Sequence, residues 1–306
     1  MVALVFLLGS PAFTHLFVPS LFATSLLIFV CVSMCYSGSM VCLPGWKHSG
    51  SLDYQVGSGS APDGDEDAIV AMILAVQAVE NWNEKPSWYD EVRKFADASS
   101  SAFLTFNTLD DSSYGDHRLL KLGSCWGGWK GNGQNPSYHS PGSYKLMRDF
   151  QASFPAGMRT YTLPFSDMTT EWNRLIATSN SVLNHFQCPL VPNWGRVTVD
   201  GNDNIVGDSG SFSGSGTPQY EFGSEASRTI WRVAFDAAMY PSEMDSFSKP
   251  YLSGIISQLD DGYAPDAGVN LKFFEGDTVS FRFSCSMVLG SMDPLSLSRR
   301  VLTSRS

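Results

Sequence analysis

Apolar residues recur every three to four positions in several stretches of the chain, and this spacing predicts amphipathic helices. The clearest stretch runs from Asp63 to Trp82. Its apolar face comprises Ile69, Met72, Ile73, Val76 and Val79. Asp63, Asp65 and Glu66 favour a helix N-terminus at its beginning, because carboxylates there interact favourably with the helix dipole.

The same spacing predicts four further helices. They span Trp88 to Phe106, the residues after Pro141 up to Phe154, the segment from Trp172 to Phe186, and the segment that carries Trp231, Ala234, Phe235 and Ala238. Residues 196–206 and 272–283 favour β-hairpins instead, because alternating residues flank Asp-Gly or Gly-Asp turns there. Amphipathic helices joined by glycine-rich loops predict one all-α domain with small β-hairpins in its loops.

The first 46 residues contain no charged side chain. Residues 16–35 are long enough for a membrane-spanning helix, although Pro19 weakens a straight one. A signal peptide or signal-anchor, a segment foreign to the natural coding sequence, and a buried core segment are all open interpretations. We divide the chain into a hydrophobic lead, residues 1–42, and a domain of residues 43–306. Either targeting interpretation predicts that this domain is secreted or is anchored to a membrane on the extracellular side.

Acidic residues outnumber basic ones by 30 to 20, which gives a formal net charge of −10. This balance argues against a nucleic-acid-binding protein, because the phosphate backbone requires a basic surface. Many aromatic residues, glycine-rich loops and few charges suit a neutral polar ligand instead. The six cysteines include no Cys-x-x-Cys pair, so the sequence predicts neither a metal site nor a cofactor.

Two groups of charged residues are candidates for chemistry. The first is the acidic cluster of residues 63–67, for which a solvated helix N-terminus, a cation site and a site for sugar hydroxyls are open alternatives. The second is Glu225 with Arg228, which share one helix face at this spacing. These two residues form either a plain surface ion pair or a carboxylate base that the arginine keeps charged.

Aromatic residues on glycine-rich loops form a third group. Trp126, Trp129 and Tyr138 lie in such loops, where aromatic side chains stack on sugar faces or anchor the loop by packing. We expect Trp126 and Trp129 to stack on the substrate.

Four collinear segments resemble glycoside hydrolase family 8. They are APDGDED at 61–67, NPSY at 135–138, LVPNW at 190–194 and FGSEASRTIWR at 222–232. The resemblance covers residues 43 to about 262. It implies an (α/α)6 barrel, incomplete at the N-terminus, and the activity of an inverting endo-β-1,4-glycanase that needs no cofactor or metal.

The resemblance also implies roles for individual residues. Asp63 matches the position that binds hydroxyls of the distorted central sugar, and Glu225 matches the general base, which is an aspartate in much of the family. Arg228 keeps that base charged, and Tyr138 lies near the attacking water. The family's general acid, a glutamate in an SEGxxYGM helix, has no counterpart in this chain, so the general acid is unknown.

The sequence therefore predicts a monomeric glycoside hydrolase of carbohydrate metabolism. Its substrate is a β-1,4-linked oligo- or polysaccharide such as cellulose or β-glucan, xylan or chitosan. The alternative is a glycan-binding protein that has lost catalysis, because inverting hydrolysis needs two carboxyl groups. Membrane association through residues 16–35 belongs to the anchored form of either function.

Overall fold

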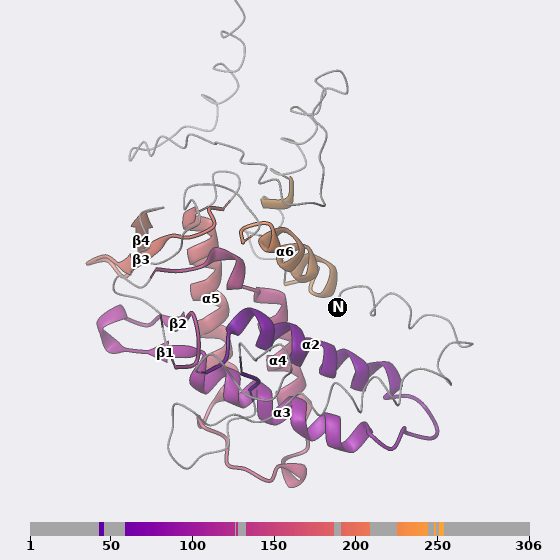
Figure 1. The fold of residues 1–306 in the computed structure, drawn as a ribbon. Coiled ribbons are helices and arrows are strands. Elements are labelled where there is room, and N and C mark those ends of the chain that lie inside the picture. Colours follow the sequence, from indigo (N-terminus) through magenta and orange to yellow (C-terminus); the bar gives the residue numbers. More distant parts are fainter. Residues whose placement is uncertain are drawn as a thin grey trace, which may run out of the picture.

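Five long α-helices and two short hairpins make up the part of the chain that the computed structural model describes (Figure 1). This part comprises residues 43–45, 59–125, 127, 133–186, 191–208, 225–243, 248 and 251–253. The helices are α2 (Pro62–Val79), α3 (Tyr89–Phe106), α4 (Pro141–Ser153), α5 (Met168–Phe186) and α6 (Arg228–Met239). All five predicted helices are confirmed, with ends that differ by a few residues. The lead, the hairpin predicted at 272–283, Trp126 and Trp129 lie outside the described residues.

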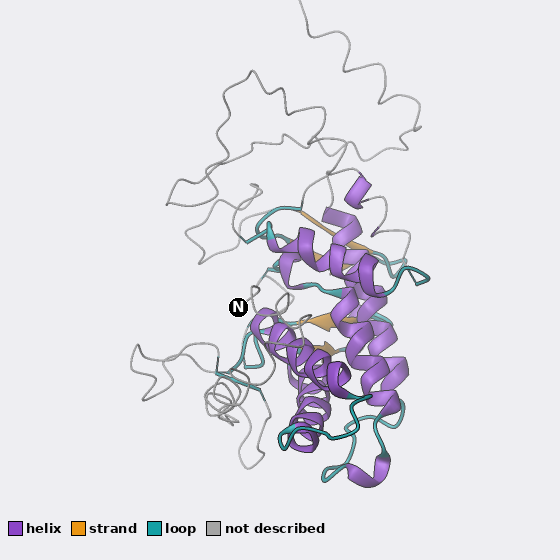
Figure 2. Ribbon diagram, turned by 90° about the vertical axis from the view of Figure 1, so that its right-hand side faces the viewer, coloured by secondary structure: helices purple, strands orange, loops and turns teal. Residues whose placement is uncertain are grey.

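Short helices and hairpins fill the loops between these helices (Figure 2). The 3₁₀ helices are η2 (Ser112–Tyr114), η3 (Pro136–Tyr138) and η4 (Ala156–Met158). The predicted hairpin pairs β3 (Arg196–Val199) with β4 (Ile205–Asp208), in antiparallel register with Val199 opposite Ile205. A second antiparallel hairpin, β1 (Thr108–Asp110) with β2 (Arg118–Leu120), was not predicted. Strands of three residues are too short to show an alternating pattern.

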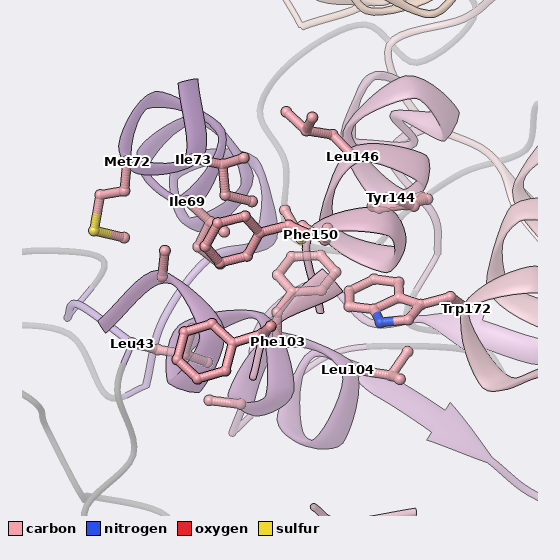
Figure 3. Packing of buried hydrophobic residues seen from close by; sticks show 14 of the residues in the cluster. Leu43, Ile69, Met72, Ile73, Phe103, Leu104, Tyr144, Leu146, Phe150 and Trp172 are labelled. Carbon is pink, nitrogen blue, oxygen red and sulfur yellow. The ribbon is translucent and has the colours of Figure 1, made fainter. Parts of the chain in front are cut away.

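Apolar side chains from α2, α3, α4 and α5 form the larger of two buried clusters (Figure 3). Phe103, Tyr144 and Trp172 pack together within it, with ring centroids 5.8–6.3 Å apart. The indole nitrogen of Trp172 donates to Gln151 Oε1 at 2.7 Å, so the buried N–H is satisfied. The second cluster joins the end of α5 to both hairpins and α6.

The buried face of α6 differs from the face suggested by its apolar residues. Trp231 is 41% exposed, whereas Arg232 and Asp236 are fully buried. Arg232 pairs with Glu66 of α2, and Asp236 accepts from Lys145 Nζ of α4 at 2.9 Å. Buried ion pairs, which hydrophobic periodicity does not reveal, therefore orient α6.

The described helices pack in a connected series: α2 against α3 and α4, and α4 against α5 and α6. The all-α prediction is confirmed for this part of the chain, and closure into an (α/α)6 barrel stays a prediction. No described helix has both the length and the apolar character needed to cross a membrane.

Candidate active site

The N-terminal ends of α2 and α6 meet at Arg228. The Arg228 guanidinium donates to Asp63 in the first turn of α2 and also to Glu225, which lies in the turn just before α6. All three side chains are partly exposed, at 19% for Asp63, 32% for Glu225 and 28% for Arg228. The site therefore presents two carboxylates to solvent on either side of one cation.

Tyr138 completes this group from a third element. It is the last residue of η3, and the Arg228 guanidinium lies 5.3 Å from the centre of its ring. On another side the ring meets Trp194 edge-on, with centroids 6.4 Å apart. Burial, reinforced by the negative charge of Asp63, raises the pKa of Tyr138 above its usual range, although Arg228 opposes the effect. Its hydroxyl therefore stays protonated and remains a hydrogen-bond donor.

Two buried asparagines hold the loops that carry the site. Asn135 caps η3, where its Oδ1 accepts from the Ser137 amide at 3.0 Å, and its Nδ2 donates to Glu225 Oε2 at 2.7 Å. Asn193 Oδ1 accepts from the backbone N–H of Ala226 at 3.0 Å. Both residues stand in the NPSY and LVPNW segments, so these motifs serve as supports for the turn that presents Glu225.

The acidic cluster at the start of α2 is not a solvated helix end. Asp65 and Glu66 are buried, and no side chain caps the helix at Ala61. Asp65 Oδ2 accepts from Asn107 Nδ2 at 2.6 Å. Burial raises the pKa of Asp65 to about 8, although Ser60 and Asn107 lower it through hydrogen bonds. Asp65 is therefore mostly protonated at neutral pH.

Glu66 lies in the interior, whereas Asp67 lies at the surface. Glu66 accepts from the Tyr144 hydroxyl at 2.6 Å and pairs with Arg232, so it belongs to the packing of α2 on α4 and α6. Asp67 lies 3.3 Å from Arg232 and is 43% exposed. Only Asp63 of the cluster contacts the Arg228 group.

The structure thus brings together four predicted site residues: Asp63, Tyr138, Glu225 and Arg228. Trp126 and Trp129 lie outside the described residues, so stacking on them stays a prediction. Sequence reasoning missed Asn135 as a contact of Glu225. Its position before Pro136 predicts a helix cap, but not a contact 90 residues away in the sequence. Within the described ranges, no group of three or more His, Cys, Asp or Glu side chains could hold a metal ion.

No family model matches the chain, and a search of curated proteins finds no match either. Among solved structures, the chain is similar to two crystal structures of a reducing-end-xylose releasing exo-oligoxylanase, one variant complexed with xylobiose and a second variant. In both cases the identity is 15%, the TM-score is 0.45, and the alignment covers 77% of this chain and 55% of that chain. The chain thus spans about half the length of these proteins. A likeness of this degree carries no functional argument.

Proposed function

We propose that the protein is a glycoside hydrolase that cleaves β-1,4-linked polysaccharide with inversion of the anomeric carbon. The observation that carries this proposal is the convergence of Asp63, Glu225 and Tyr138 on Arg228. Hydrolysis needs a charged base beside a water molecule and polar groups that hold the sugar. This group supplies both at a partly exposed position.

In the proposed reaction, Glu225 takes a proton from water as the water oxygen bonds to the anomeric carbon. The bond from that carbon to the glycosidic oxygen breaks at the same time, and the leaving oxygen receives a proton from a general acid. Arg228 keeps Glu225 charged, since a guanidinium in contact stabilises a carboxylate. Asp63 accepts hydrogen bonds from sugar hydroxyls, and Tyr138 donates to the attacking water.

A glycan-binding protein without catalysis is the second candidate. Asp65 and Glu66, the carboxyl groups closest in sequence to Asp63, are buried and make hydrogen bonds inside the protein. Neither can reach a glycosidic oxygen in this arrangement. If no other carboxyl group replaces the missing acid, the same four site residues would bind a glycan without cleaving it.

We further propose that the domain works outside the cytosol, either secreted or anchored through residues 16–35. The composition of the lead supports this placement. Cys125 is disulfide-bonded, and such bonds persist in oxidising compartments.

The test compares two kinds of substrate. Cellulose, mixed-linkage glucan, xylan and chitosan need a general acid, whereas β-cellobiosyl fluoride and β-xylobiosyl fluoride do not, because fluoride leaves without a proton. We expect turnover of a fluoride to give the α-anomer first in proton NMR, and Glu225→Gln to reduce this turnover by at least ~10²-fold. Oligosaccharide affinity should stay within a few-fold in that variant.

Each outcome distinguishes the candidates. Cleavage of a polysaccharide would establish a working glycanase with an acid still to be found. Turnover of fluoride alone would show that the base functions and that the acid is missing. Calorimetric binding of oligosaccharides without any turnover would favour the glycan-binding protein. Unchanged turnover in Glu225→Gln would exclude Glu225 as the base.

A further inference from the structure

Asn135 is a fully buried polar residue whose side chain joins two parts of the site. Its Oδ1 accepts from the backbone N–H of Ser137 at 3.0 Å and from the Ser137 hydroxyl at 2.7 Å. Its Nδ2 donates to Glu225 Oε2 at 2.7 Å. One side chain therefore caps the short helix that ends at Tyr138 and also contacts the proposed base.

The orientation of the Asn135 amide follows from these contacts. The Ser137 amide nitrogen can only donate, so the atom of Asn135 that faces it must be the carbonyl oxygen. The NH₂ group must then face Glu225. Because Asn135 Oδ1 caps η3, the Asn135 NH₂ group must donate its hydrogen bond to the proposed base, Glu225.

Both described contacts of the Glu225 carboxylate use the same oxygen. Asn135 Nδ2 and Arg228 Nη2 each donate to Oε2. A carboxylate held through one oxygen by donors from two elements has little freedom to rotate, and neither of these two contacts occupies its other oxygen. This geometry selects Oε1 as the oxygen that meets a water molecule.

We propose that Asn135 is the positioning residue of the base: it holds Glu225 so that Oε1 accepts the proton of the attacking water. This inference rests on the proposed function and extends it to a residue that does not touch the substrate. Glu225 has one more rotatable bond than an aspartate at the same position would have, so its carboxylate can adopt more positions. A second hydrogen-bond donor restricts this freedom.

Two variants separate the donor from the cap. Asn135→Ser keeps a good capping oxygen for η3 but is too short to reach Glu225, and it adds no charge. Asn135→Asp keeps the shape and the cap, and it replaces the donor with an acceptor that repels Glu225. Ser137→Ala is the matched control, because it removes a contact of Asn135 Oδ1 and leaves the contact with Glu225 in place.

The primary measurement is the carbon-13 NMR signal of the Glu225 carboxyl group in glutamate-labelled protein, with Glu225→Gln to assign the signal. We expect the chemical shift of this signal to change in Asn135→Ser and Asn135→Asp, which lose the donor, and to stay unchanged in Ser137→Ala. The same chemical shift in the parent and in both Asn135 variants would overturn the proposal.

The same variants are then assayed with the glycosyl fluoride. We expect kcat to fall at least ~10-fold in both Asn135 variants while KM changes little, because the base is displaced and the groups that bind the sugar are kept. A kcat in Asn135→Ser equal to that of the parent would also overturn the positioning role. Failure of the proposed function is distinct, because the parent would then show no fluoride turnover at any pH while the NMR result would still report on the contact.

Discussion

Arg228 contacts two carboxylates at once, and this shapes what each of them can do. Asp63 and Glu225 come from positions 162 residues apart in the sequence, and without the guanidinium between them their like charges would repel each other. The guanidinium offsets this repulsion and holds both carboxylates at one place. One is then available to hold a sugar and the other to act on water.

Asp63→Ala tests whether Asp63 binds the sugar. We expect the variant to bind cello- or xylo-oligosaccharides about 10-fold more weakly, because a charged acceptor for sugar hydroxyls is lost. The measurement is isothermal titration calorimetry. Asp67→Ala is the matched control, since Asp67 lies one turn further along α2 and pairs with Arg232 rather than Arg228. Equal affinities for Asp63→Ala and the parent would remove Asp63 from the site.

Single residues of the site were predictable to different degrees. Asp63, Glu225 and Arg228 were singled out by the resemblance of segments 61–67 and 222–232 to a known family, because local charge patterns left a solvated helix end and a surface ion pair open. The burial of Asp65 and Glu66 could not be foreseen, because their partners come from distant segments: Asn107 directly follows α3, and Arg232 lies in α6. Helical periodicity describes how one helix meets the core, and it does not describe which polar groups meet across helices.

At the level of whole elements, the position of α6 depends on its contact with α4. A Cβ atom added at Gly142 would lie 2.6 Å from the Cα atom and 2.8 Å from the backbone nitrogen of Asp236. The two helix backbones therefore touch at this point, and the ion pair of Lys145 with Asp236 lies beside it. Because α6 begins at Arg228, this contact also determines where the arginine sits relative to α2.

Gly142→Ala should disturb both stability and the site. We expect the free energy of unfolding to fall by about 1–3 kcal/mol in chemical denaturation, because a backbone, unlike a flexible side chain, cannot move aside. Fluoride turnover should fall as well, since α6 carries Arg228. Gly157→Ala is the control, because nothing lies within 4 Å of its added Cβ atom. Similar unfolding free energies for the two variants would show that α4 and α6 adjust without cost.

The elements themselves were largely predictable. Long stretches with helical spacing, such as that of α2, fix both the type and the approximate ends of a helix. The β3–β4 hairpin was found because each strand alternates around an Asp-Gly turn. The β1–β2 hairpin was not predicted because its strands are short. Its buried Arg118 pairs at 2.6 Å with Glu171 of α5, a contact between distant segments that the local pattern does not reveal.

On the scale of the whole molecule, buried titratable groups make stability depend on pH from two sides. Burial lowers the pKa of His139 to about 3. The Gln134 amide donates to Leu120 O, so its Oε1 must accept from His139 Nε2, and His139 Nδ1 accepts from the Ser179 hydroxyl. This neutral form contributes stability that is complete above the unfolded pKa of 6.5 and is lost as the pH falls towards 3.

Asp65 acts in the opposite direction. Its pKa is raised from 3.8 to about 8 in the folded protein, so the folded state holds a proton that the unfolded state has released. The stability that this proton contributes is therefore complete below pH 3.8 and is lost as the pH rises through about 8. Their opposite slopes cancel between pH 3.8 and 6.5, so the two groups together place the most stable range at acidic pH.

Asp65→Asn should remove the loss of stability at alkaline pH and leave the loss at acidic pH unchanged. An amide at this position still accepts from Asn107 and has no titratable proton, so the variant should lose less stability between pH 5 and 9 than the parent, by up to ~4 kcal/mol. Thermal unfolding at pH values from 4 to 9 measures the difference in stability between the variant and the parent. This difference should be smallest near pH 4. Asp116→Asn is the control, because the side chain of Asp116 is 90% exposed and its ion pair with Arg174 contributes little. Parallel pH profiles for Asp65→Asn and the parent would mean that Asp65 is ionised in the folded protein at neutral pH.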